Sequence, residues 1–316
     1  MRVATVTLNP CVDKSFSVPR VVPDRKLAAA DVRHDPGGGG LNVARVITRL
    51  GGEVRALWSC GGGTGERVAQ MLAAEGVVHE PIPIEQPVRE NLIIEDRSSG
   101  EQYRFGLPGA PLSEAERAEW LTHVRELSPA YLVVSGSLPA GVSVDWYGEL
   151  LGAASSDTRV IVDTKREALA RALELGVYLI KPNLAELAEL TELTELGGEG
   201  CEDDDEIEAA AQTIIRSGGA EVVLVSLGRA GALLVTADNP PERLFAPSVP
   251  LRSKVGAGDS LVGGLVAALS RGEPLRDAVA RGIAAGTATV MTEGTQLCRR
   301  EDVERLYPRV GRSRGR

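Results

Sequence analysis

Residues 253–269 (SKVGAGDSLVGGLVAAL) place two glycines and an acid immediately before an apolar pattern with helical spacing. Gly256 and Gly258 have no side chain and Ala257 has only a methyl group. The backbone N–H groups of these three residues are therefore open to an anionic ligand at the start of this helix. The helix dipole favours negative charge at that end. The stretch therefore suits an anion hole for a phosphoryl group in transfer.

Asp259 follows in the first helical turn and is a candidate general base. The helix dipole is expected to lower its pKa, so that it is ionised at pH 7 and can accept a proton. An Asp in this place is equally typical of a helix cap, and the local sequence leaves the two interpretations open.

A second glycine run, in DPGGGGLNVARVITRLGG, precedes a helical pattern over residues 41–52. Four consecutive glycines are entropically costly for a plain turn, which favours close approach of a ligand to the backbone. Asn42, directly after the run, could bind a sugar hydroxyl or cap the helix.

Polar residues also follow other predicted strands. In KPNLAEL, Asn183 and Glu186 are three residues apart, which fits a capping box and a carboxylate near Mg²⁺ equally well. Asp163 is a second acid at the end of a strand and a further candidate for the metal. Arg89, Arg104 and Lys26 are candidate phosphate ligands, although most exposed arginines are merely solvated.

Short apolar strands alternate along the chain with helical patterns. This alternation predicts an α/β fold with a mostly parallel central sheet covered by helices on both faces, and ligand sites at the carboxyl ends of the strands. The strands are expected at 3–9, 53–61, 130–137, 159–165, 177–183 and 221–228. The helices are expected at 41–52, 64–76, 144–155, 166–176, 184–190, 205–218 and from 259 onward.

Two segments break the alternation. Residues 11–36 have little helical period, and residues 88–109 predict a two-stranded hairpin that turns at RSSG. We expect both to form a small β-sheet lid on a single domain spanning residues 1–316, because a lid excludes water from phosphoryl transfer. The alternative is an edge hairpin of the main sheet.

Composition excludes several function classes. A net charge of −9 argues against a general nucleic-acid or membrane-surface role, and no apolar run approaches about 18 residues. The four cysteines form no CxxC pair, which predicts reduced thiols in a cytoplasmic protein. The chain has no GxxxxGK[ST] motif and no evident Ser/His/Asp triad. Residues 61–69 have GxGxG spacing, not GxGxxG, which disfavours a nicotinamide site.

Taken together, the motifs resemble the PfkB branch of the ribokinase-like sugar kinases. The N-terminal signature of that family resembles PGGGGLNVARVITRLGG, and the C-terminal one resembles KVGAGDSLVGGLVAAL. SGSLPAGV, KPNLAEL and VSLGRAGALLV fit between them in order, so the resemblance covers about residues 1–308. It implies a ribokinase-like three-layer αβα sandwich with a β-sheet lid, with ATP and Mg²⁺ as cofactors.

Within the family the chain is most similar to ATP-dependent 6-phosphofructokinases, through GGGG before Asn42, SGEQYRFGLPGA and EGTQLC. This resemblance implies phosphorylation of the C1 hydroxyl of fructose 6-phosphate to fructose 1,6-bisphosphate. The 1-phosphofructokinases and tagatose-6-phosphate kinases are similar too, but the former usually carry a lysine where this chain has Gly39. A sugar-phosphate-binding regulator that has lost catalysis is a rival from another class.

The resemblance also implies a role for each matching residue. Asp259 would be the base, and residues 256–258 would form the anion hole. The sugar hydroxyls and the sugar phosphate would be held by Asp13, Gly38, Gly39, Asn42, Lys26, Arg89 and Arg104, with Ser137 nearby. The nucleotide and Mg²⁺ would be held by Lys181, Asn183, Glu186, Ser226, Gly228 and Gly231. Family members commonly form homodimers through their lids, which would let Lys26 act across the interface.

Overall fold

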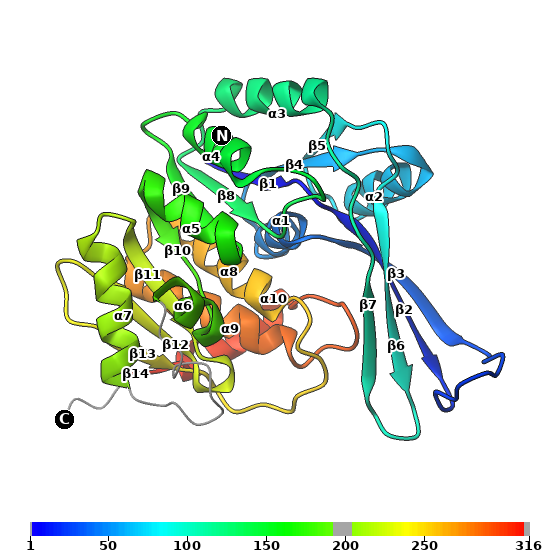
Figure 1. Ribbon diagram of the computed structural model, residues 1–316. Coiled ribbons are helices and arrows are strands. Elements are labelled where there is room, and N and C mark those ends of the chain that lie inside the picture. Colours follow the sequence, from blue (N-terminus) through cyan, green and yellow to red (C-terminus); the bar gives the residue numbers. More distant parts are fainter. Residues whose placement is uncertain (1, 192–203, 313–316) are drawn as a thin grey trace.

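The computed structural model describes residues 2–191 and 204–312, and its centre is a ten-stranded sheet (Figure 1). The strand order is β14-β13-β12-β11-β10-β9-β8-β1-β4-β5. Seven strands are parallel: β1 (Val3–Thr7), β4 (Arg55–Cys60), β5 (His79–Pro83), β8 (Tyr131–Ser135), β9 (Arg159–Asp163), β10 (Val177–Ile180) and β11 (Ala220–Ser226). Three at one edge are antiparallel: β12 (Ala232–Thr236), β13 (Glu242–Phe245) and β14 (Gly311–Arg312).

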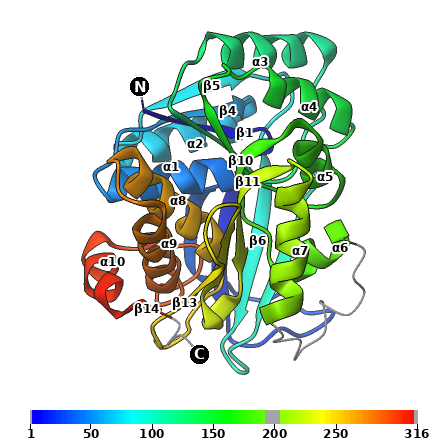
Figure 2. The same cartoon turned by 90° about the vertical axis from the view of Figure 1, so that its left-hand side faces the viewer.

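Helices cover both faces of the sheet, which gives the predicted three layers (Figure 2). One face carries α1 (Gly39–Arg49), α2 (Gly62–Ala74), α8 (Ala257–Ser270), α9 (Leu275–Thr289) and α10 (Arg300–Leu306). The other carries α3 (Glu114–Glu126), α4 (Val144–Gly152), α5 (Arg166–Leu175), α6 (Leu184–Thr191) and α7 (Asp204–Arg216). Two short 3₁₀ turns, Gly228–Ala230 and Tyr307–Arg309, complete the elements.

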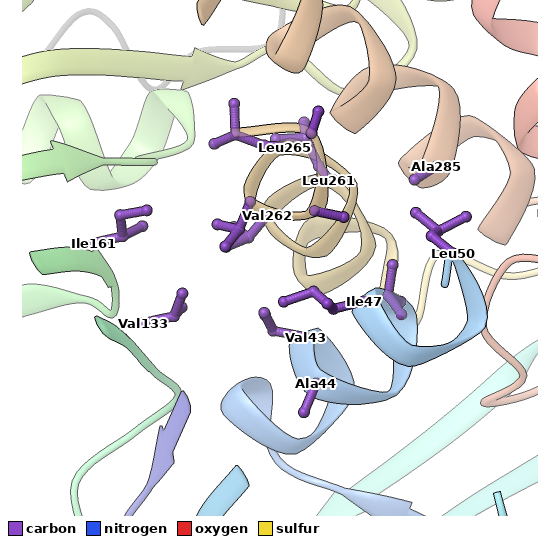
Figure 3. Close-up of a cluster of buried hydrophobic side chains, with 14 of the residues drawn as sticks. Val43, Ala44, Ile47, Leu50, Val133, Ile161, Leu261, Val262, Leu265 and Ala285 are labelled. Atoms are coloured by element: carbon purple, nitrogen blue, oxygen red, sulfur yellow. The ribbon is translucent and has the colours of Figure 1, made fainter. Parts of the chain in front are cut away.

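The strands are buried on both faces, and successive residues serve opposite cores. On β8, Val133 packs toward α1 and α8, whereas Leu132 and Val134 pack into the cluster under α3–α7. Figure 3 shows Val43 and Ile47 of α1 beside the α8 side chains in the first of these cores. The two helices approach closely because α8 has a glycine at the contact: a Cβ on Gly263 would be 2.7 Å from the Cβ of Val46.

The lid is a separate four-stranded sheet that projects from the body (Figure 1). Its order is β3-β2-β6-β7, with β2 at Cys11–Val18, β3 at Ala30–Gly37, β6 at Arg89–Asp96 and β7 at Gln102–Gly106. The predicted hairpin is confirmed as β6 and β7, and the alternative of an edge hairpin on the main sheet is wrong. Pairing with β2 gives the hairpin a sheet of its own.

The structure also contains elements outside those predicted. Strand β12 runs antiparallel to β11 because the short connection around the turn Gly228–Ala230 cannot make the crossover that parallel strands need. Strand β13 in turn pairs antiparallel with β12. Strand β5 and helices α3, α9 and α10 were not predicted either. Among the described residues, Cys11, Cys60 and Cys298 are free thiols, and Cys201 lies outside them. No helix in the described part of the chain is long and apolar enough to cross a membrane.

Candidate active site

The start of α8 lies at the edge of the sheet where the parallel strands end. Gly256 is the N-cap and has left-handed backbone angles (φ 73°, ψ 2°) that favour glycine, and no side chain caps the helix. The carboxylate of Asp259, the third helical residue, accepts a hydrogen bond from Nδ2 of Asn42 in α1 at 2.8 Å. The interpretation of Asp259 as a cap is therefore wrong, and its carboxylate is directed to the neighbouring helix.

The pKa of Asp259 is raised to about 6, against the decrease predicted from the helix dipole. Burial is the main cause, and the nearby carboxylates of Asp163 and Asp13 raise it further. The hydrogen bond from Asn42 and the charge of Lys181 oppose the rise. A carboxyl with a pKa near 6 is ionised at pH 7, yet it is far more basic than an ordinary Asp, which suits a general base.

A buried ion pair adjoins this helix start. Nζ of Lys181 lies 3.2 Å from Oδ1 of Asp163, and the two side chains are 7% and 14% exposed. Burial alone would lower the pKa of Lys181, but Asp163 outweighs it and the pKa is raised, so the ammonium is charged. A Cβ on Gly258 would lie 3.6 Å from Nζ of Lys181. The cation and the helix N-terminus therefore face the same space.

The NxxE pair forms the capping box. The Asn183 Oδ1 accepts from the Glu186 N–H, and the Glu186 Oε2 accepts from the Asn183 N–H, both at 2.9 Å. The described residues contain no group of three or more His, Cys, Asp or Glu that could hold a metal. Mg²⁺ commonly takes only one or two carboxylates, and phosphate oxygens and waters complete its coordination. Glu186 and Asp163 therefore fit Mg²⁺ only when a phosphate and waters supply the other ligands.

The sugar-side candidate Asp13 is buried on β2. Its Oδ1 accepts hydrogen bonds from Sγ of Cys11 at 3.1 Å and from Nδ2 of Asn91 at 2.9 Å. Burial and the Asp13 charge raise the pKa of the Cys11 thiol well above its usual value, so it remains a protonated donor. A Cβ on Gly37 would lie 2.3 Å from the other oxygen of Asp13. The first glycine of the run thus leaves room for this carboxylate.

The rest of the glycine run packs on the strand ends. Gly38 is the N-cap of α1 with φ 115°. A Cβ on Gly39 would lie 2.3 Å from Oγ of Ser135, and a Cβ on Gly40 would lie 2.4 Å from the Val6 carbonyl oxygen. In this structure a side chain at Gly39 or Gly40 would therefore force its neighbours to shift. Approach of a sugar to Gly38 and Gly39 remains a prediction.

The two lid arginines lie on one face of the lid. Asp13 pairs with Asn91, and Ile93 with Arg104, so the strand alternation places Arg89 and Arg104 on the same face as Asp13. Arg89 donates to Oδ1 of Asn91 and to the Leu107 carbonyl, both at 3.1 Å, and to the Asn9 carbonyl at 3.3 Å.

Arg104 is exposed, and its one side-chain hydrogen bond within the described part of the chain is donated to Oε1 of Gln102 at 3.4 Å. The loop between β2 and β3 lies at the end of the lid away from the body (Figure 1). Lys26 in this loop is exposed, and the described residues give it no hydrogen bond or ion pair. The structure thus brings Arg89 and Asp13 together but leaves Lys26 apart from them.

The nucleotide-side candidates lie at the same sheet edge. Ser226 ends β11 and forms a bridge to Asn183, and its Oγ donates to the Pro182 carbonyl at 3.3 Å. Gly228 begins the next turn and Gly231 directly follows it, at φ 56° and 99°. The sugar-side candidate Ser137 lies past the end of β8 and accepts a hydrogen bond from Nδ2 of Asn9 at 3.0 Å.

Comparison with known proteins accounts for this assembly of motifs. Residues 5–302 match the model of the pfkB family carbohydrate kinases. The chain belongs to this family.

Three relatives match nearly the whole chain. ATP-dependent 6-phosphofructokinase isozyme 2 of Escherichia coli is 41% identical over 99% of this chain and 100% of that protein. The 1-phosphofructokinase of Borreliella burgdorferi is 31% identical over 97% of this chain and 96% of its own. The crystal structure of phosphofructokinase-2 from Escherichia coli in complex with fructose-6-phosphate has a TM-score of 0.90 at 39% identity, over 98% of this chain and 99% of that chain. The predicted ribokinase-like fold class is confirmed.

The structure of this carbohydrate kinase adds site residues that the sequence did not single out. Cys11 and Asn91 both bond to Asp13, and Asn9 bonds to Ser137. Asn91 could have been found, because it is two positions after Arg89 in a predicted strand and so shares its face. Asn9 ends the predicted strand 3–9, so its place at a strand end was a signal, and Cys11 is two positions before Asp13.

Proposed function

We propose that the chain transfers the γ-phosphoryl group of ATP to the C1 hydroxyl of fructose 6-phosphate. The observation that carries the proposal is the Asp259 carboxylate, which has a pKa near 6 and lies at the N-terminus of α8 between Asn42 and the Lys181 cation. This combination provides a base for a hydroxyl and positive potential for a phosphoryl group.

In the proposed reaction the C1 oxygen forms a bond to the γ-phosphorus while the bond from phosphorus to the bridging oxygen of ADP breaks. Asp259 accepts the hydroxyl proton. The N–H groups of Ala257 and Gly258 and the ammonium of Lys181 stabilise negative charge on the phosphoryl oxygens. ATP with Mg²⁺ supplies the activated phosphoryl group, with Glu186 and Asp163 as the candidate carboxylates on the metal side and Asn183, Ser226, Gly228 and Gly231 beside the nucleotide.

On the sugar side, Asp13 and Asn42 are proposed to hold hydroxyl groups, with the backbone of Gly38 and Gly39. Higher identity to a 6-phosphofructokinase than to a 1-phosphofructokinase supports fructose 6-phosphate as the acceptor. The deciding experiment is a coupled ADP-release assay with fructose 6-phosphate, fructose 1-phosphate and tagatose 6-phosphate. Preference for either of the last two would replace the proposed substrate. Sugar-phosphate binding without ADP release would instead indicate a regulator.

We expect Arg89→Ala to raise the KM for the sugar phosphate about 10- to 100-fold and to change kcat much less. Charge-assisted hydrogen bonds to a phosphate contribute about 1.5–3 kcal/mol, and this arginine lies on the same lid face as Asp13. Arg104→Ala is expected to act in the same direction. Arg97→Ala, an exposed arginine at the hairpin turn, is the control and should leave KM unchanged. Unchanged KM in both lid variants would place the phosphate clamp elsewhere.

The face of the lid opposite Asp13 carries apolar side chains that support a homodimer. Leu92 pairs with Phe105 and Ile94 with Tyr103, which places four apolar side chains together on the face opposite Asp13. Phe105 is 50% exposed, and Tyr103 is also exposed. A second copy of the lid would cover such a surface. It is also the proposed route by which Lys26 reaches the partner's site.

Phe105→Glu is therefore expected to shift the protein to monomers in sedimentation velocity, because it places a charge in an apolar interface. The sugar-phosphate KM should rise at the same time if Lys26 acts across the interface. Leu175→Glu, at an exposed leucine of α5 on the body, is the matched control and should leave the assembly intact. A dimer that survives Phe105→Glu would move the interface away from the lid.

A further inference from the structure

Arg45 is a buried cation that the proposed chemistry does not use. It belongs to α1 and is 1% exposed, among the largest fully buried side chains of the described chain. Its Nε and Nη2 donate to Oε1 of Glu75 at 3.0 and 2.6 Å. Its Nη1 donates to the Pro36 carbonyl at 2.8 Å and to Oδ1 of Asn42 at 3.1 Å. One side chain therefore joins α2, the base of the lid and the residue that contacts Asp259.

The hydrogen bond between Arg45 and Asn42 fixes which end of the Asn42 amide faces Arg45. A primary amide has one acceptor oxygen and one donor nitrogen, and a guanidinium only donates. Arg45 therefore holds the Asn42 oxygen on its own side, which turns Nδ2 toward Oδ2 of Asp259 at 2.8 Å. In the opposite orientation the Asn42 oxygen would meet the Asp259 carboxylate, and the Asn42 NH₂ group would meet the N–H groups of Arg45.

Nη1 of Arg45, which donates to Asn42, also donates to the lid. Pro36, whose carbonyl it binds, is in β3, and the preceding Asp35 has a carboxylate oxygen 3.8 Å from Nη2 of Arg45. The other oxygen of Asp35 accepts from Oγ1 of Thr295 at 2.6 Å. The lid base is thus tied to the guanidinium that orients the Asn42 amide.

We propose that Arg45 is a positioning residue that fixes the orientation of the Asn42 amide and thereby keeps Asp259 available as a proton acceptor near neutral pH. The proposal rests on the proposed role of Asp259 as the base. A donated hydrogen bond favours the ionised carboxylate, and Asn42 opposes the burial that raises the pKa of Asp259.

The charged groups around the two residues are few. Asp259 is influenced by Asp163 at the end of β9, Lys181 after β10 and Asp13 on β2, while the nearby Cys11 thiol is protonated. Arg45 faces Glu75, the residue directly after α2, and Asp35 of β3, and Glu75 also binds Arg49 at 2.8 Å. Losing Arg45 therefore leaves Glu75 with a partner, while Asn42 loses its only described side-chain donor.

The test is Arg45→Met, which keeps much of the side-chain length and removes every donor. The readout is the titration of the Asp259 carboxyl by NMR on protein labelled with ¹³C in its aspartate carboxyl groups, assigned with Asp259→Asn. We expect the pKa to rise by about one unit, and the acid limb of kcat to move by the same amount. Arg49→Met is the matched control. It also removes an ion pair with Glu75, but Arg49 does not hydrogen-bond to Asn42.

Equal Asp259 titrations in wild type, Arg45→Met and Arg49→Met would overturn the proposal. If Arg45→Met does not fold, Arg45→Lys provides the measurement, because a lysine keeps the charge but cannot bind Glu75, Pro36 and Asn42 together. An intermediate rise is expected there, and no rise would overturn the proposal. The NMR titration needs no substrate, so its outcome is independent of whether fructose 6-phosphate is the acceptor.

Discussion

Asp259→Asn is expected to lower kcat about 10³-fold while the protein stays folded and binds nucleotide. General base catalysis contributes about 10²- to 10⁴-fold, and an amide cannot accept the hydroxyl proton. In the wild type, kcat should fall as the pH drops below about 6, where the base becomes protonated. The measurements are steady-state kinetics from pH 5 to 9 and nucleotide binding by calorimetry.

The same substitution has a predictable effect on stability. The folded pKa is raised from its ordinary 3.8 to about 6, so between these values the unfolded chain releases the proton while the folded chain keeps it. Stability conferred by this group is complete below about pH 4 and is lost as the pH rises through 6. The full loss is about 3 kcal/mol, at 1.36 kcal/mol for each pKa unit. Asp259→Asn should therefore be about 1–3 kcal/mol more stable than wild type at pH 8, with the difference vanishing near pH 4.

Asp277→Asn is the matched control for Asp259→Asn. Asp277 is also the third residue of its helix, α9, but its side chain is 38% exposed and pairs with Arg276. Asp277→Asn should leave kcat and the urea midpoint at pH 8 unchanged. Normal turnover in Asp259→Asn would remove the base from the proposed mechanism, and an unchanged urea midpoint at pH 8 would contradict the burial argument.

Lys181→Met is expected to destabilise the protein by about 3–5 kcal/mol, because it leaves the Asp163 carboxylate buried without its partner. Turnover at pH 7 should also fall, for two reasons. The phosphoryl group loses a nearby cation, and the loss of positive charge raises the pKa of Asp259 further. Urea unfolding and the pH profile of kcat measure the two effects separately.

The double variant Lys181→Met with Asp163→Asn separates structural from catalytic effects. Replacing both members of a buried pair is often neutral for stability, so much of the lost stability should return. Turnover should not return, because the cation at the start of α8 is still missing and Asp163, a candidate carboxylate on the metal side, is lost with it. Recovery of turnover in the double variant would reduce Lys181 to a structural partner of Asp163.

The places of most candidate site residues could be predicted from the sequence, because local patterns define the elements that carry them. A glycine pair before an apolar helix predicts α8 and its open N-terminus, and the polar residues after strands predict a shared edge of a parallel sheet. Alternating residues between turn signals predicted the β6–β7 hairpin. These patterns depend on neighbours a few residues away.

The antiparallel edge and the separate lid sheet needed the tertiary structure. Whether β6 pairs with β2 or with the main sheet is settled by contacts between segments about 80 residues apart. No local pattern encodes that choice, because a half-buried strand shows the same alternation in either sheet.

The chemistry of Asp259 shows where local reasoning ended. Its sequence placed it in the first turn of a helix, where the dipole argument predicts a lowered pKa, and that prediction was wrong. Folding buries the carboxyl beside Asp163 and brings Asn42, 217 positions away, into hydrogen-bonding contact. The sequence by itself determined the residue types and the elements that carry them. Only the tertiary structure decided how basic Asp259 is and which residues orient it, because burial and long-range partners outweigh the dipole of a single helix end.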